Sequence, residues 1–314
     1  MHEIEIFRSD LIGSGLHIWG WEIAVYLFLG GMTAGVMIIA PLLARRIPAE
    51  RQSLALRLLP FAAPVLLSIG MLALLLDLEG KLHVFRFYTA FRITSPMSWG
   101  SWILLLIYPA TIALGAARLK EDEAGLVSSR LSTRWAARFD TAIRWTREKS
   151  AILERLNIVL GIALGAYTGI LLATLAARAL WGSMLLAPLF LVSGLSAGAA
   201  LAMLLPVSEE ERHILQRWDL AAIAGETGLL AFLFIGLVSD GGERGRAAAA
   251  LFFGGAYTAT FWAFVVIAGL AAPFVLELTE SKRHLKAAAL APALLLFGGL
   301  ALRWIFVLAG QANV

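Results

Sequence analysis

Several ionisable side chains lie inside or at the edges of long apolar stretches, where an unpaired charge is costly. His17 and Asp77 stand at the ends of two such stretches, and Glu226 and Arg303 stand inside two others. A histidine beside a carboxylate can exchange a proton near neutral pH, because the negative charge stabilises the imidazolium. A glutamate and an arginine buried in apolar surroundings can pair, or can form one station of a hydrated proton path. These residue types indicate proton exchange.

His17, Trp21 and Asp77 form the first candidate site. His17 and Trp21 are four residues apart, so a helix that contained both would place them on one face. If the first two apolar stretches form a hairpin, Asp77 ends the second one beside the start of the first. A quinone needs hydrogen-bond partners at its carbonyls and protons for its reduction, and a histidine backed by a carboxylate can supply both. The alternative is that these residues are polar helix ends in the lipid headgroup region.

A second candidate group consists of Glu226, Asp219, Arg178 and Arg303. Glu226 lies near the middle of an apolar stretch, and Asp219 precedes it by about two helical turns. An arginine close to Glu226 would complete an intramembrane ion pair or a proton path. For Arg178, at the end of a stretch, the alternative is a side chain that extends to the membrane surface.

The elements that must position these residues are long apolar helices. The chain is 60% hydrophobic and 15% charged, with a mean hydropathy of +0.80. About 20 apolar residues cross a bilayer as a helix, and the stretches show none of the alternation of a β-barrel strand. We expect an all-α, polytopic membrane protein with one integral domain, residues 1–314. Its eight transmembrane helices are expected at about 19–44, 55–76, 99–117, 152–177, 183–205, 217–238, 247–276 and 285–309. Four helices on each side of residue 180 would permit two four-helix bundles.

Basic residues predict the orientation of the chain. Of its 26 lysines and arginines, 18 fall on one side of the expected helices. By the positive-inside rule this side is cytoplasmic and both termini are periplasmic. A multi-pass protein of the inner (cytoplasmic) membrane of a bacterium or archaeon is therefore expected, with lipid rather than nucleic acid explaining the basic charge. No cleavable signal peptide is expected, because acidic residues precede the first stretch.

The cytoplasmic loop 118–150 is the main polar interruption. It carries Trp135 and Trp145 among arginines, which is typical of an amphipathic helix lying on the inner leaflet. A solvated linker is the alternative.

Redox cofactors held by the chain itself are not expected. The sequence has no cysteine, and none of its five histidines lies in the middle of a stretch, so ligands for haem, an iron–sulfur cluster or another metal are lacking. A redox role would need electrons from a partner.

Glycines spaced four residues apart mark candidate helix contacts. They are Gly31 and Gly35, Gly161, Gly165 and Gly169, and Gly194 and Gly198. Small residues allow close backbone approach between helices in lipid. The alternative is that they leave room for a flat ring or an isoprenoid tail.

Two classes of function remain open from the residues alone. One is a quinone-reactive anchor subunit of a respiratory enzyme, and the other is a secondary transporter that binds an anionic solute through Glu226 and the arginines. Prolines and glycines that would break helices fall near helix ends, which favours the redox hypothesis.

Several sequence blocks, in order, resemble the NrfD/PsrC family, the membrane subunits of polysulfide reductase and its relatives. The blocks are Gly20-Trp21-Glu22 through Thr33-Ala34-Gly35, Leu76-Asp77-Leu78, Thr94-Ser95-Pro96-Met97-Ser98-Trp99-Gly100, Ala166-Tyr167-Thr168-Gly169, Arg178-Ala179-Leu180-Trp181, Ser193-Gly194, Leu302-Arg303-Trp304 and Ala309-Gly310-Gln311. They extend over nearly the whole sequence, and the loop 118–150 is the part least like the family.

This resemblance implies an eight-helix subunit that binds menaquinone or ubiquinone near the outer surface and is not catalytic alone. It implies partners, namely a ferredoxin-like subunit with four-iron clusters and usually a molybdopterin catalytic subunit, in place of which other members of the family have hydrogenase or cytochrome subunits. His17 matches the family's quinone-contacting histidine, and Asp77, Arg178, Glu226 and Arg303 match positions implicated in proton movement. The family's quinone-contacting tyrosine has three candidates, Tyr88, Tyr108 and Tyr167.

Overall fold

The structure is a computed structural model that describes residues 19–78, 81, 96–173, 178–239, 241–283 and 289–312. Eight helical spans in these residues are long and apolar enough to cross a membrane, as predicted. They are formed by α1 (Trp21–Arg46), α2–η2–α3 (Leu54–Leu58, Leu59–Phe61 and Ala62–Asp77), α5 (Pro96–Ala117), α8 (Ser150–Ala173), α9 (Leu186–Leu204), α10 (Glu209–Ser239), α12–η4–α13 (Thr258–Thr260, Phe261–Ala271 and Ala272–Arg283) and α14 (Leu290–Gln311).

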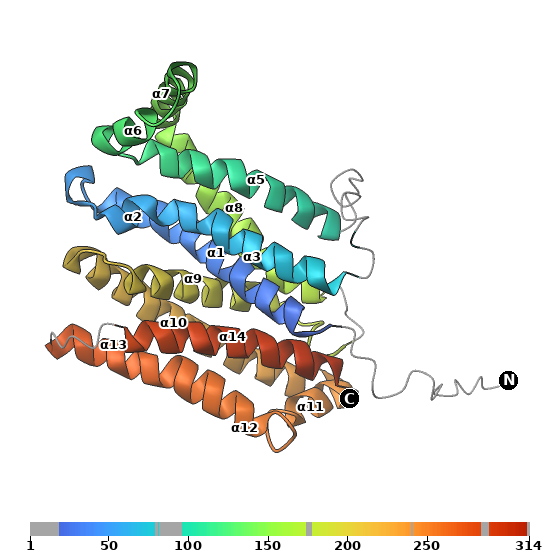
Figure 1. The fold of residues 1–314 in the computed structure, drawn as a ribbon. Coiled ribbons are helices and arrows are strands. Elements are labelled where there is room, and N and C mark those ends of the chain that lie inside the picture. Colours follow the sequence, from blue (N-terminus) through green and yellow to red (C-terminus); the bar gives the residue numbers. More distant parts are fainter. Residues whose placement is uncertain are drawn as a thin grey trace.

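The spans pack as two groups of four helices that meet along α1 and α9 (Figure 1). In the first group α1 contacts α3 and α8, while α5 contacts α8 and α3. In the second group α9 contacts α10 and α14, and α14 packs against η4. The central helix α1 is the most enclosed, with 89% of its most apolar stretch buried, against 28% for the seventh span.

The two central helices touch through the glycines that the sequence singled out. A Cβ atom on Gly35 would lie 2.0 Å from the carbonyl oxygen of Gly194, and one on Gly198 would lie 2.5 Å from the carbonyl carbon of Gly35. One on Gly194 would lie 2.5 Å from the oxygen of Gly31. The backbones are therefore in direct contact, so at this crossing the packing interpretation of the glycines is correct.

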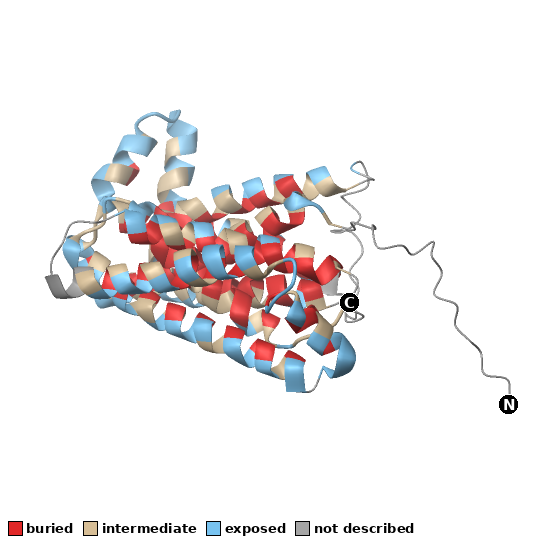
Figure 2. Cartoon of the chain, turned by 90° about the horizontal axis from the view of Figure 1, so that it is seen from below, coloured by how far each residue is buried: buried red, intermediate tan, exposed pale blue. Residues whose placement is uncertain are grey.

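The peripheral spans carry many exposed residues (Figure 2), and large apolar residues are among them. On α3 the residues Val65, Ile69, Leu72 and Leu76 are each about half exposed and repeat at helical spacing. This pattern is expected where a helix face meets lipid hydrocarbon rather than water. Buried residues gather in the middle of the bundle, around α1 and α9.

Two spans depart from a continuous α-helix. The second span is interrupted by the short 3-10 segment η2, which contains Pro60 and links α2 to α3. Proline cannot donate the backbone hydrogen bond of a regular α-helix. In the seventh span, η4 (Phe261–Ala271) is a π-helix of 11 residues.

The seventh span also begins later than predicted, at Thr258 rather than near 247. Residues 242–250 instead form a separate helix, α11 (Gly242–Ala250). The chain reverses between the two through Gly254, whose φ of +113° is a conformation that only glycine adopts freely.

The two ends of the bundle differ in charge. The end at which α1, α5 and α13 finish and α8, α10 and α14 start carries Arg45, Arg118 and Arg212, and is called the basic end. The opposite end, where α1 starts and α3 finishes, is called the Asp77 end. At the basic end the predicted loop 118–150 folds into two helices, α6 (Glu121–Ser128) and α7 (Thr133–Glu148). These two helices project from the bundle as an arm (Figure 1).

Candidate functional site

Asp77 lies against the start of α1. The backbone N–H of Gly20 donates a hydrogen bond to the Asp77 carboxylate, and the Glu22 carboxylate lies close enough to interact with it electrostatically. α1 and α3 pack along their lengths, so the hairpin predicted for the first two spans is present. Trp21, the first residue of α1, is 47% exposed at this rim. Asp77, Trp21 and Glu22 therefore form a carboxylate and indole cluster at one membrane surface.

His17 lies outside the described residues, so its position relative to Asp77 is a prediction. The shared helical face of His17 and Trp21 likewise stays a prediction, and the described part of α1 begins at Trp21. Gly20 has extended backbone angles, with φ −87° and ψ −162°. The Glu22 side chain folds back over Gly20, within 2.2 Å of where a Cβ atom would stand. The acidic group thereby sits at the positive end of the helix dipole.

A second set of contacts joins the start of α1 to the end of α14. The side-chain amide of Gln311 donates to the carbonyl of Trp19 at 2.9 Å, and its oxygen accepts from the Trp19 N–H at 2.9 Å. The rings of Trp19 and Trp181 contact each other with centroids 5.1 Å apart and planes tilted by 34°. Arg178 donates to the carbonyls of Gln311 and Ala312, at 3.2 and 3.4 Å. A cation at the C-terminus of a helix stabilises the exposed carbonyl groups and the helix dipole.

In the middle of the bundle Arg303 is fully buried. Its Nη1 donates to the hydroxyl of Ser193 at 2.8 Å, and its Nη2 donates to the carbonyl of Phe190 at 3.2 Å. Its guanidinium carbon also stands 5.1 Å from the centroid of the Phe190 ring. Gly31 makes room for this group, since a Cβ atom there would lie 2.8 Å from Arg303 Nη2.

Glu226 completes this buried group from α10. It is 4% exposed, hydrogen-bonds with Ser193, and interacts electrostatically with Arg303. The Ser193 hydroxyl can accept from Arg303 and donate to Glu226, so it bridges the cation and the carboxylate. Of the two arginines predicted near Glu226, Arg303 interacts with it electrostatically, whereas Arg178 is engaged with the end of α14.

Asp219 lies nearer the basic end, on the same face of α10 as Glu226. Both Asp219 and Glu277 of α13 are buried, at 0% and 1% exposure. Asp219 faces the hydroxyl of Ser196 and the carboxyl of Glu277 at hydrogen-bonding range. Neither Asp219 oxygen has a well-aligned hydrogen bond among the described residues. Two carboxyl groups from different spans therefore face each other inside the bundle.

These groups form a polar row through the second half of the bundle. The row contains Arg303, Ser193, Glu226, Ser196, Asp219 and Glu277, from helices α9, α10, α13 and α14. It begins mid-bundle and extends toward the basic end, because Asp219 follows the start of α10 by ten residues, or about 15 Å. The Asp77 cluster lies at the other end.

Sequence reasoning missed Glu277, because it stands only a few residues before the polar segment that ends the seventh span. A signal was nevertheless present: residues 258–276, which precede it in the same span, include no charged side chain. The Ser193 bridge was also missed, since serine alone gives little signal.

The described residues also line an apolar cleft of about 760 Å³ between α10 and η4. Its walls include Phe234, Phe253, Phe261 and Trp262, and Thr227 contributes a hydroxyl group to its lining. Thr227 already donates to the carbonyl of Ile223 at 2.8 Å. This cleft suits an apolar tail, but it offers a quinone ring few hydrogen-bond donors.

No group of three histidine, cysteine, aspartate or glutamate side chains that could hold a metal ion comes together in the part of the protein that the structure describes. The polar groups that the candidate sites bring together are carboxylates, an arginine, hydroxyls and indoles.

Comparison of the sequence with known proteins identifies the family of the chain. Residues 12–314 match the family model described as "Polysulphide reductase, NrfD". The chain is 31% identical to protein NrfD of Escherichia coli over 310 residues, covering 95% of this chain and 96% of the relative. It is 30% identical to the C subunit of polysulfide reductase from Wolinella succinogenes, covering 95% of each. It is 25% identical to the NrfD homologue of Haemophilus influenzae, again with 95% of each covered. With its eight apolar spans, the chain is a multi-pass integral membrane protein that belongs to the NrfD family of polysulphide reductase.

Proposed function

We propose that the chain is the quinone-reactive membrane subunit of a respiratory redox complex. The observation that carries the proposal is at the Asp77 end, where the carboxylate accepts a hydrogen bond from Gly20 at the start of α1, the helix whose first residue is the exposed Trp21. Membership of a family that includes a subunit of polysulfide reductase supports a role as one part of such a complex.

The residues of this cluster fit a quinone headgroup. A flat ring can lie against an exposed indole at the level of the lipid headgroups, and the Trp21 ring is available there. Asp77 offers an acceptor that can bind a quinol hydroxyl or stabilise a protonated histidine. Menaquinone or ubiquinone, when bound, would supply the exchange of two electrons and two protons.

In this proposal His17, Trp21 and Asp77 have separate roles. His17, three residues before Gly20, holds or releases the proton at its imidazole. Asp77 stabilises the charged imidazolium, and the hydrogen bond from Gly20 keeps the carboxylate in place. Trp21 forms one wall for the ring.

In this proposal the electrons come from a partner, since the sequence has no cysteine to hold an iron–sulfur cluster. We propose that a ferredoxin-like subunit with four-iron clusters docks at the Asp77 end, together with a molybdopterin catalytic subunit. Lys81 is exposed there, and Arg86 and Arg92 follow in the same connection but lie outside the described residues. Basic side chains suit an acidic docking surface.

The polar row supports a second part of the proposal, that protons move through the bundle by way of Arg303, Glu226 and Asp219. Two facing carboxyl groups in an apolar interior cannot both be charged, so Asp219 and Glu277 together can hold a proton. Glu226 and Ser193 offer the next acceptor and donor. Arg178 could contribute only to the outer end of the proposed path, because it donates a hydrogen bond to the Gln311 carbonyl at the end of α14.

An anion transporter is less well supported. The Arg303 guanidinium, which would have to bind the solute, already contacts Ser193, Phe190 and Gly299 and has no exposed surface. The Glu226 carboxylate beside it would repel an anion.

The test uses the complete complex purified with its partners. Replacing His17 by leucine, or Asp77 by asparagine, should lower quinone-linked turnover by about 100-fold, the lower range for loss of an acid–base group, while assembly stays intact. Glu243→Gln is the matched control, since Glu243 is an exposed carboxylate on α11 at the same end. Turnover that is unchanged in both test variants would remove these residues from the mechanism.

A further inference from the structure

The arm at the basic end is held to the bundle by one face of α7. Ile143 and Thr146 on that face are 4% and 5% exposed. Arg147 donates to the carbonyl of Leu119 at 2.7 Å and stands 3.8 Å from the Glu121 carboxylate. α6 is anchored in turn by the ion pair of Glu123 with Arg57 of α2. The inward face of the arm is therefore committed to the protein.

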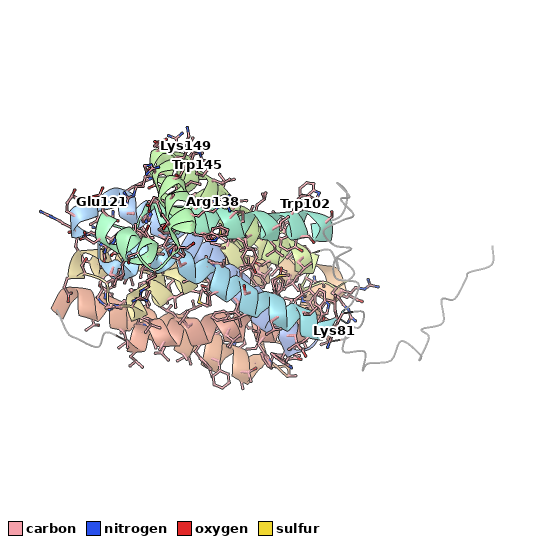
Figure 3. The ribbon with its side chains drawn as sticks, turned by 45° about the horizontal axis from the view of Figure 1, so that its top comes forward. Lys81, Trp102, Glu121, Arg138, Trp145 and Lys149 are labelled. Carbon is pink, nitrogen blue, oxygen red and sulfur yellow. The ribbon has the colours of Figure 1, made fainter. Side chains whose placement is uncertain are left out.

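The exposed side of α7 carries a basic and aromatic stripe. With about 100° of turn per residue, four side chains of α7 and that of Lys149, its C-cap residue, fall within an arc of about 100°. They are Arg134, Trp135, Arg138, Trp145 and Lys149, called the α7 stripe. All five are exposed, with Trp135 at 59% and Trp145 at 54%. Figure 3 labels Arg138, Trp145 and Lys149 on the arm.

The α7 stripe has no acidic member. Residues 130–149 contain six basic and two acidic side chains, and the two acids, Asp140 and Glu148, fall outside the arc. Arg138 lies over the Trp135 ring, with 5.2 Å between its guanidinium carbon and the ring centroid. An exposed, cationic and aromatic helix face is suited to an anionic surface that also has an apolar layer.

The direction of α7 indicates which kind of surface the α7 stripe can contact. The spans run from one end of the bundle to the other, whereas α7 lies across them and extends beyond the first group of helices (Figure 1). A helix that leaves the bundle in this direction at the ends of the spans runs along the plane of the membrane. Tryptophan favours the headgroup region, and arginine reaches lipid phosphates from it.

We propose that the α7 stripe binds the headgroups of anionic phospholipids in the leaflet at the basic end. Trp135 and Trp145 insert at the level of the glycerol backbone, while Arg134, Arg138 and Lys149 pair with phosphates. By the distribution of basic residues this leaflet is the cytoplasmic one. The inference is independent of the proposed redox function.

The absence of cysteine from the sequence makes a direct test possible, since one introduced cysteine is a unique labelling site. Ala142 is exposed within the stripe, and Ala137 is exposed on α7 about 140° away. A nitroxide is placed on Ala142→Cys or on Ala137→Cys in the full-length protein. Each is reconstituted in phosphatidylcholine or in an equal mixture of phosphatidylcholine and phosphatidylglycerol. The relative collision rates with oxygen, which enters lipid, and with a water-soluble nickel complex report the depth of the label.

In the anionic membrane the label at residue 142 should be shielded from nickel, and the label at residue 137 should stay accessible. Each basic residue near an anionic surface shifts binding by about fivefold, so Arg134→Gln, Arg138→Gln and Lys149→Gln together should reduce the bound-to-free ratio of the arm by about 100-fold. The matched control replaces three exposed arginines of the same end outside the stripe by glutamine, namely Arg51, Arg155 and Arg217. It should leave the label depth unchanged.

Equal nickel accessibility of the two labels in both membranes would overturn the proposal. So would a label at residue 142 that becomes shielded only when extrinsic partner subunits are added, because the stripe would then bind protein. The comparison of the two labels needs no charge substitution, so it stands even if the triple variant fails to fold.

Discussion

Replacing Glu226 by glutamine tests whether Arg303 and Glu226 form a charged pair inside the bundle. Glutamine has nearly the same shape and can still hydrogen-bond with Ser193, so the packing should survive. What is lost is the negative charge beside a guanidinium that has no exposed surface.

The expected magnitude follows from that burial. Removing one partner of a buried pair costs about 3–5 kcal/mol, because the remaining charge stays buried without compensation. In the Glu226→Gln variant Arg303 keeps its three hydrogen bonds to Ser193, Gly299 and Phe190. Because these bonds still stabilise the buried guanidinium, we expect the free energy of unfolding to fall by about 3 kcal/mol, the lower limit of that range.

The assay is equilibrium unfolding of the purified protein in mild detergent, followed by circular dichroism. Glu210→Gln is the matched control, because Glu210 is an exposed glutamate on the same helix. It should change the free energy of unfolding by less than about 0.5 kcal/mol. The double variant Glu226→Gln with Arg303→Met removes both charges and should recover much of the loss. A Glu226→Gln variant as stable as the parent would refute the charged pair.

Two further predictions concern the helix crossing and the arm. Gly35→Ala places a Cβ atom 2.0 Å from the carbonyl oxygen of Gly194, so thermal unfolding should show a loss of stability of about 1–3 kcal/mol. The control Gly228→Ala, whose Cβ atom meets nothing within 4 Å, should change the stability little. Equal losses in the two variants would contradict the glycine contact. Burial alone would raise the pKa of Glu123, but hydrogen bonds from Arg57 and from a backbone N–H lower it overall. The attachment of the arm should therefore be complete above the ordinary glutamate pKa of 4.5 and be lost as the pH falls further, as seen in the mobility of a nitroxide on α6. Glu123→Gln should remove this pH dependence, and a dependence that persists would point to another group.

Much of the fold could be predicted from the sequence because lipid restricts the choices. Every backbone polar group in hydrocarbon must be satisfied within its own helix, so each apolar run of sufficient length becomes a span. Glycines four residues apart predicted close helix contacts, since packing in lipid depends on small residues, and the structure places two of these pairs at the contact of α1 with α9.

Other features depend on contacts that the sequence does not display. Gly254 separates α11 from the seventh span, but the apolar residues 247–253 read as part of that span. Nothing in Phe261–Ala271 distinguishes a π-helix from an α-helix.

The candidate site was also predictable only in part. Glu226 and Arg303 stood out because a charge inside an apolar run demands a partner, and each proved to be near the other. Glu277 did not stand out, because its burial results from the packing of α13 against α10. The pairing of Arg178 with the end of α14 likewise depends on a contact between residues more than 130 positions apart.

Photolabelling tests the central claim, a quinone at the Asp77 end, most directly. The complete complex is illuminated with an azidoquinone, and the labelled peptides are identified by mass spectrometry, with excess unmodified quinone as competitor. We predict competed labelling of the peptides that contain Trp21 and Asp77. Competed labelling confined to the apolar cleft between α10 and η4, with none at the Asp77 end, would contradict the proposal.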